Sequence, residues 1–297
     1  MTQNELNKII ENHQHYLNKD IDGWESMRAD LSDKNLSGLN LKNANLREAN
    51  FRNANLSNSN LGDANLNNAD LAYADLRKAD LRKAALRNAN LINADLRNAE
   101  LREANLYRAF CCYTNMYKAN LSNAYLREAD LCSAFCCYTN LYGVDLRGAD
   151  LREANLLRAD LRKADLREAN LRNAYLSGTD LSEDTKIDCP IACPEIGSFI
   201  GYKKAICKKI VKLQICEDAK RSSATTKKCR CSKALVLAIE NIDGSDSGLQ
   251  KIASKFDPCF IYRIGEIVEV PDFDDNRWNE CAPGIHFFMD RQNAVEY

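Results

Sequence analysis

Several features that would point directly to a function are missing from this 297-residue sequence. No run of 18 apolar residues occurs, and the N-terminus lacks a basic segment followed by an apolar one. We therefore expect neither a membrane span nor a secretory signal, and we expect a cytoplasmic protein. The net charge is −1, so no overall field would draw the chain to nucleic acid or to a membrane. Phosphate loops of the G-x-x-x-x-G-K-[ST] or G-x-G-x-x-G type are also missing.

Proline does not occur before Pro190, and all five prolines lie beyond Thr185. Cysteine, in contrast, is abundant, with 13 residues. An odd total that includes the adjacent pairs Cys111-Cys112 and Cys136-Cys137 does not fit the disulfide framework of a secreted protein. Free thiols in a reducing compartment are the expectation, and no cofactor is indicated.

A five-residue period runs from Leu31 to Leu181 without an insertion. Of its 31 central residues, 27 are leucine, and the others are Phe51, Cys111, Met116 and Cys136. A small residue, usually alanine, lies two places before nearly every centre, Lys34 and Leu39 being the exceptions, so we number the small residue position 1 and the centre position 3. A period of five fits neither the 3.6 of a helix nor the 2 of a strand.

Small and large apolar side chains at positions 1 and 3 suit a square coil with four pentapeptides per turn. The A-(D/N)-L-x-x pattern, as in Ala44-Asn45-Leu46-Arg47-Glu48, resembles the pentapeptide-repeat family over about half of the chain. The resemblance implies a mainly β fold, a right-handed quadrilateral β-helix. With about 4.8 Å between coils, the 31 units would make about eight coils and a rod roughly 37 Å long.

Residues 1–28 are predicted to form an N-terminal helical cap, followed by the β-helix over 29–184. Leu6, Ile9, Ile10, His13 and Leu17 share one helical face, and Thr2 with Glu5 suits a capping box. The exposed end of a solenoid requires such a cover. His13 and His15 are interpreted as polar positions of this cap, with metal binding as the alternative.

The charge of the repeats bears on the activity that the family resemblance implies. Pentapeptide-repeat proteins are best known for protecting or inhibiting gyrase through a rod that imitates the charge of duplex DNA. Between Leu31 and Ser182, however, 21 Lys and Arg face 18 Asp and Glu. Such imitation requires a strongly acidic face, because duplex DNA carries one charge per about 1.7 Å. The topoisomerase-binding DNA mimic is therefore kept only as an alternative.

One part of the repeat departs from the Arg/Asn/Glu surface. The segment Ala109–Asn115 recurs as Ala134–Asn140, one turn and one side further along a square coil, which would place the two copies around one corner in consecutive coils. Clustered aromatic residues there predict a contact surface, either for another protein or for the C-terminal domain of the same chain. The predicted contact residues are Tyr107, Phe110, Tyr113, Tyr117, Phe135, Tyr138 and Tyr142.

Two sets of cysteines are candidates for bridges or metal ligands. Cys112 and Cys132 are separated by one full turn of the predicted coil, so they should stack at a separation compatible with a disulfide. Cys189, Cys193, Cys229 and Cys231 could bind zinc, although the single residue between the last two is too few for the usual spacing. Free thiols, with no metal, are the prediction in both cases.

Residues 185–196 are predicted to be a linker, and 197–297 a small α+β domain. Apolar runs predict strands around 210–215, 234–239, 260–264, 267–270 and 284–288, with a hairpin at Gly265 and a last helix capped by Asp290. The motif Cys281-Ala282-Pro283-Gly284-Ile285-His286-Phe287-Phe288 resembles a poorly characterised domain with a Cys-x-x-Gly-Ile-His-Phe-Phe signature, which implies no activity. A Cys281/His286 nucleophilic pair is the enzymatic alternative.

Eleven Lys and Arg lie between Lys203 and Lys233, against Glu217 and Asp218. They indicate either a solvated face or a weak, nonspecific contact with a polyanion. Aromatic residues for base stacking are nearly missing there, which disfavours specific nucleic-acid recognition. The overall prediction is a non-enzymatic scaffold, monomer or homodimer, whose partner is another protein and whose rigid rod presents a C-terminal recognition domain.

Overall fold

The computed structural model describes residues 1–188, 192–279 and 282–297. The chain divides into two compact units, 1–188 and 189–297. Within the described ranges, no helix is both long enough and apolar enough to span a membrane. Each unit is described by itself below.

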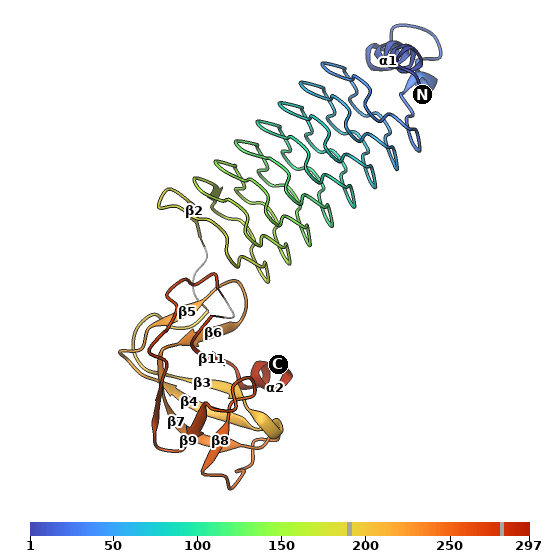
Figure 1. The fold of residues 1–297 in the computed structure, drawn as a ribbon. Helices are drawn as coiled ribbons and strands as arrows, with labels where there is room; N and C mark the ends of the chain where they lie inside the picture. Colours follow the sequence, from blue (N-terminus) through green and yellow to red (C-terminus); the bar gives the residue numbers. More distant parts are fainter. Residues whose placement is uncertain (189–191, 280–281) are drawn as a thin grey trace. The chain divides into compact units, whose positions relative to one another are not determined.

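The first unit is a stack of pentapeptides with a helix at its N-terminal end (Figure 1). Isolated parallel bridges join position 2 of each repeat to position 2 of the fourth repeat that follows, from Asp30↔Asn50 to Asp160↔Asp180. Four pentapeptides therefore separate bridged residues, as expected. The elements of this unit are α1 (Gln3–Asn18), the 3-10 helix η1 (Trp24–Met27), β1 (Asp165–Leu166) and β2 (Lys186–Ile187). The parallel pair β1–β2 continues the ladder to Ile187.

Hydrogen bonding explains why each position takes its residue type, and the unit Ala54-Asn55-Leu56-Ser57-Asn58 is typical. The N–H groups of Asn55, Leu56 and Asn58 donate at 2.9, 2.7 and 2.9 Å to carbonyls of adjacent layers. The N–H at position 1 of the next unit donates to the Leu56 carbonyl at 3.1 Å and closes a turn. The remaining N–H, at position 4, donates to the Asn55 side chain at 3.0 Å. Asn or Asp at position 2 thus completes the backbone hydrogen bonding.

The core follows from positions 1 and 3, which are buried along nearly the whole stack. Position 5 has φ near +60° in most units, which is left-handed backbone that Asn and Gly adopt most easily.

The offset of four repeats between bridged residues arranges the repeats in four rows. Row 1 contains the centres 31, 51 and so on to 171; row 2 begins at 36, row 3 at 41 and row 4 at 46.

Helix α1 covers the first layer of the stack. The predicted capping box of Thr2 and Glu5 is present at its start. Polar side chains of α1 satisfy backbone groups of the first layer: Gln3 both donates to and accepts from Asn40 at 2.9 Å, and Gln14 donates to the Asn45 carbonyl. His13, expected at a polar position, is fully buried. Its Nδ1 accepts from the Ala29 N–H and its Nε2 donates to the Arg47 carbonyl, both at 3.0 Å.

The second unit is almost entirely antiparallel β-structure. One sheet has seven strands in the order β10-β7-β4-β3-β11-β6-β5, and a second pairs β8 with β9. The strands are β3 (Phe199–Lys204), β4 (Ile210–Ile215), β5 (Arg221–Ser223), β6 (Lys228–Cys231), β7 (Lys233–Glu240), β8 (Lys251–Ala253), β9 (Ile261–Arg263), β10 (Ile267–Glu269) and β11 (Ile285–Phe288). The helices are η2 (Ile206–Lys208) and α2 (Arg291–Glu296).

The sheet differs from the sequence prediction in two respects. The hairpin predicted at Gly265 is wrong, because β9 pairs with β8 while β10 pairs with β7. Gly265 has φ +83° and makes a turn between strands of two different sheets. The expected α+β balance also overstates the helix content, since α2 is the one α-helix in the described part of this unit. Its predicted cap, Asp290, accepts from the Asn293 N–H at 3.1 Å.

Replacing a centre should cost far more stability than replacing its neighbour. Leu101 is fully buried at position 3, whereas Arg102 at position 4 is exposed. We expect Leu101→Ala to lower the free energy of unfolding by about 2–5 kcal/mol, because it leaves a cavity between layers. Arg102→Ala, the matched control, should change it by no more than about 0.5 kcal/mol. Urea unfolding measures both, and equal effects would contradict the assignment of inward and outward positions.

The buried His13 should make the first unit sensitive to acid. Burial lowers the pKa of His13 below its ordinary 6.5, so the folded state holds the ring neutral. The stability that the neutral His13 ring contributes is fully present above pH 6.5, the ordinary pKa. It is lost as the pH falls from there through the lowered pKa of His13 in the folded state. In His13→Gln, the stability at pH 7.5 should drop by about 1–3 kcal/mol and the further loss between pH 7.5 and 5 should shrink. An unchanged pH slope in urea unfolding would refute this role.

Candidate functional site

Four of the seven predicted contact residues are exposed on the repeat stack. The exposed fractions are 48% for Phe110, 55% for Tyr113, 50% for Phe135 and 42% for Tyr138. The other three, Tyr107, Tyr117 and Tyr142, are half-buried.

The row arrangement brings five of the seven together. Phe110 and Tyr113 belong to row 1, and Tyr117, Phe135 and Tyr138 belong to the adjoining row 2. Tyr117 and Tyr138 are in edge contact, with ring centroids 5.8 Å apart. We call these five residues the aromatic face.

The remaining two lie in other rows, each beside cations. Tyr107 is in row 4, where its ring is 5.0 Å from the guanidinium groups of Arg87 and Arg108. Tyr142 is in row 3, where its ring is 5.9 Å from the Arg162 guanidinium and 5.5 Å from the Lys163 amine. We define the aromatic face by rows 1 and 2, and the wider set of seven stays a prediction.

Two members of the aromatic face occupy position 2, where the repeat needs an acceptor. Phe110 and Phe135 cannot accept from the position-4 N–H groups of Cys112 and Cys137, as Asn or Asp would. Each substitution gives up a hydrogen bond worth about 0.5–1.5 kcal/mol while leaving a phenyl ring half exposed. Folding therefore does not explain these two aromatic residues.

The same reasoning identifies two residues that the sequence prediction left out. Tyr125 in row 4 and Tyr175 in row 2 also occupy position 2, with exposed fractions of 54% and 43%. The signal that could have found them is an aromatic residue at position 2, irrespective of clustering.

Partly exposed thiols lie between the aromatic residues. Cys112 and Cys132 are stacked in row 1, and Cys137 lies in row 2; all three are free thiols. Burial raises the pKa of Cys112 to about 12, so this sulfur stays protonated at neutral pH. The buried centres Cys136 and Met116 form a sulfur–sulfur contact of 4.0 Å.

Three of the four C-terminal cysteines considered as zinc ligands lie together in the structure. Cys193, Cys229 and Cys231 are free, buried members of one core cluster, whereas Cys189 lies outside the described residues. A hydrogen bond from Cys229 lowers the pKa of Cys193, and the same contact raises that of Cys229. Among the described residues, no three His, Cys, Asp or Glu side chains are placed to hold a metal ion.

The basic stretch is largely engaged in internal contacts. Arg230 is buried and donates to the carbonyls of Pro283 and Asn276. Arg221 donates to several carbonyls around the start of the unit. Of the eleven cations, eight donate hydrogen bonds within the unit: Lys203, Lys204, Lys209, Lys220, Arg221, Lys227, Arg230 and Lys233.

His286 lines a cavity of about 530 Å³ together with Lys203 and Tyr262. Burial lowers the pKa of His286 to about 3, so its ring is neutral at physiological pH. Its buried Nε2 has no hydrogen-bond partner among the described residues. Cys281, the nucleophile of the enzymatic alternative, lies outside the described residues, so the Cys281/His286 pair stays a prediction.

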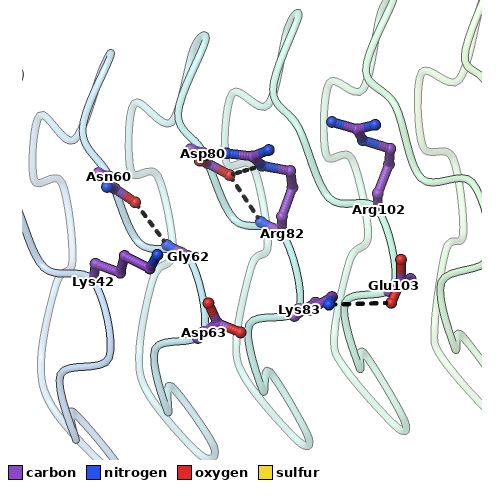
Figure 2. A pocket seen from close by; sticks show the side chains of 9 residues that line it. All are labelled: Lys42, Asn60, Gly62, Asp63, Asp80, Arg82, Lys83, Arg102 and Glu103. Carbon is purple, nitrogen blue, oxygen red and sulfur yellow. Dashed lines mark hydrogen bonds and ion pairs between the residues drawn. The ribbon is translucent and has the colours of Figure 1, made fainter.

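A shallow hollow of about 320 Å³ lies on row 3 of the stack (Figure 2). It exists because Gly62 carries no side chain at position 4, where neighbouring layers have Lys42 and Arg82. Its charges are mixed: Arg82 pairs with Asp80 at 2.5 Å, and Lys83 with Glu103 at 3.8 Å. We assign this hollow no site.

Comparisons with known proteins agree with the repeat and leave the second unit without a known function. The model of pentapeptide repeats (8 copies) matches residues 27–63, 49–88, 79–110, 119–158 and 145–183, together about half of the chain. A family of unknown function (DUF5758) matches residues 189–294. No curated protein matches the chain.

Several solved structures are similar to the repeat segment. The pentapeptide repeat protein Rfr23 from the cyanobacterium Cyanothece 51142 is 34% identical, covering 35% of this chain and 64% of its own, with a TM-score of 0.25. The match thus spans less than two thirds of Rfr23. HetL, involved in heterocyst differentiation regulation in the cyanobacterium Nostoc sp. strain PCC 7120, is 32% identical over 54% of this chain and 87% of its own, with a TM-score of 0.27.

QnrB1, a plasmid-mediated fluoroquinolone resistance protein, is 18% identical over 52% of this chain and 90% of its own, with a TM-score of 0.33. At these TM-scores no functional argument rests on the superpositions. The assignment to a family rests on the match to the family model of pentapeptide repeats and on the unbroken five-residue period of the bridges. The chain belongs to the pentapeptide-repeat family.

Proposed function

We propose that the protein is a cytoplasmic, non-enzymatic binding scaffold whose repeat segment recognises a protein partner through the aromatic face. In this proposal the repeats wind as a right-handed quadrilateral β-helix of about eight coils over residues 29–184. A helical cap (1–28) precedes it, and a linker (185–196) leads to a C-terminal domain (197–297). The offset of the bridges supports four repeats per coil.

The observation that carries the proposal is the placement of phenyl rings where the repeat needs an acceptor. Phe110 and Phe135 are half exposed, so burial within the stack returns little of the lost hydrogen bond. A protein partner would cover these rings, and aromatic side chains commonly dominate the binding energy of interfaces. The neighbouring Tyr113 and Tyr138 add further exposed rings in the same two rows.

The DNA-mimic alternative receives little support from the charges. Acidic side chains at position 2 are paired with arginine at position 4 of the same repeat, as in Asp75–Arg77 at 2.6 Å and Asp145–Arg147 at 2.6 Å. The pairing recurs at Asp80, Asp95, Asp150, Asp160 and Asp165. A surface neutralised in this way lacks the field of a phosphate backbone.

Restoring the usual residue at position 2 should stabilise the stack. In Phe110→Asn and Phe135→Asn, the new amide can accept from the position-4 N–H, so each variant should gain about 0.5–1.5 kcal/mol in free energy of unfolding. Urea denaturation of the full chain measures the gain. A loss of stability in both variants would mean that the rings contribute to folding, against the argument for a contact surface.

Partner capture from extracts of the native host should depend on the same two rings. The Phe110→Asn/Phe135→Asn double variant should lose a partner that the unaltered chain retains, because the interface loses its aromatic contacts. Tyr73→Asn is the control, since it removes an exposed ring at position 5 of a repeat whose position-2 acceptor is intact, and it should keep the partner. Quantitative mass spectrometry of the captured proteins reads this out, with light scattering to detect a second copy of the chain as the partner. Equal capture by all three proteins would place recognition elsewhere.

A further inference from the structure

A buried lysine at the base of the C-terminal cavity is not used by the scaffold proposal. Lys203 lies on β3 near the end of the strand, beside β11. The two strands share one register pair, Tyr202↔Phe288, and the carbonyl of His286 accepts from the Lys203 side chain. The Nζ–O distance is 3.3 Å. The cavity of about 530 Å³ therefore has an amine among its lining groups.

This amine is poorly compensated as an ammonium ion. Lys203 is 8% exposed, and an ammonium group has three donors to satisfy. Among the described residues, no carboxylate forms an ion pair with it. A buried cation without a counter-ion is costly, so burial shifts the protonation equilibrium of Lys203 toward the neutral amine.

The groups around Lys203 agree with this conclusion. Its pKa is lowered to about 8, chiefly by burial; Cys231 of β6 acts in the opposite direction, and Lys228 of β6 contributes to the lowering. His286 of β11 is neutral, because burial lowers its pKa to about 3. Burial likewise raises the pKa of the Tyr262 phenol of β9, which stays protonated. A neutral amine is a nucleophile, whereas an ammonium ion is not.

The cavity walls and mouth restrict what could reach the amine. Aromatic and apolar side chains form part of the wall, namely Phe256, Phe260, Val270 and Pro271. Three acidic residues, Asp257, Glu269 and Asp272, also line it, and all three are exposed. This balance opposes the entry of an anion and favours an uncharged or cationic molecule with an apolar body.

We propose that this cavity is a binding site in which the Lys203 amine forms a reversible imine with a small, uncharged or cationic aldehyde. The amine lone pair attacks the carbonyl carbon, forming a C–N bond as the C=O π bond breaks. The carbonyl oxygen then leaves as water with both amine protons, and the product is a C=N bond to Nζ. No oxidant or reductant takes part, and hydrolysis returns the free lysine.

Reductive trapping on the full chain tests the site. The protein is incubated at pH 8 with benzaldehyde and cyanoborohydride, which fixes the imine as a benzyl amine, and the modified lysines are mapped by peptide mass spectrometry. Lys204 is the internal reference, because it lies on the same strand and donates to the Val295 carbonyl at 2.8 Å. We expect Lys203 to be modified at least about tenfold faster than Lys204, since at pH 8 far more of a low-pKa amine is neutral.

Two further measurements, a pH series and a comparison with an anionic aldehyde, distinguish the proposed imine site from an anion-binding site. The rate at Lys203 should rise with pH and level off above about 8, as its pKa requires. The anionic 4-carboxybenzaldehyde should react more slowly there than benzaldehyde, because three acidic residues line the cavity. Modification of Lys203 no faster than Lys204, or a preference for the anionic aldehyde, would overturn the proposal, the latter in favour of an anion site.

A variant supplies the last control. Lys203→Met should abolish the fast modification, and Lys204→Met should leave it unchanged. Because the main measurement is made on the unaltered protein, it stands even if Lys203→Met fails to fold. Loss of the fast phase in Lys204→Met, with the fold intact by circular dichroism, would also contradict the assignment.

Discussion

One backbone N–H in every pentapeptide, at position 4, has no carbonyl partner in the ladder. The other four N–H groups of a unit such as 54–58 donate to carbonyls in adjacent layers or within the turn. The fifth needs a side-chain acceptor, and Asn55 provides it. This requirement explains why Asn or Asp occupies position 2 in most repeats, and it leaves the long side chains at position 4 to cover the surface. The composition of the stack outside its core follows from this one donor.

The repeat could be predicted from the sequence because its contacts recur at a fixed offset. Burial at positions 1 and 3 and bridges between units four repeats apart require only the period and the small volume of alanine. The C-terminal sheet has no such regularity. Its central strand β3, near the start of the unit, pairs with β11 near the end, and apolar runs do not encode such pairing. The prediction at Gly265 is wrong for this reason: a local turn signal says nothing of which strands its flanks will join.

Only those features of the candidate sites that show in the local sequence pattern could be predicted. Exposed aromatic residues stand out because they interrupt a regular surface, but separating Tyr107 and Tyr142 from the others needs the row arrangement. In the sequence, Lys203 is one cation in a basic stretch. Its strand alternates Gly201 and Lys203 on the inward face, where apolar residues are expected, so the local pattern carries no signal of burial. Which lysine is buried depends on the distant strands around it.

Charge neutrality and the aromatic face are connected through position 2. An aspartate there accepts the position-4 N–H and also pairs with an arginine at position 4, as Asp160 does with Arg162. Each exposed pair adds little stability, but the repetition of such pairs leaves the surface without a strong field of either sign. A partner cannot be drawn to such a surface by long-range attraction. Recognition by the stack must then rely on short-range contacts, and these are available where Phe110 and Phe135 replace the acceptor and the ion pair is interrupted. In the proposed function, the same position that completes the fold also determines where a partner would bind.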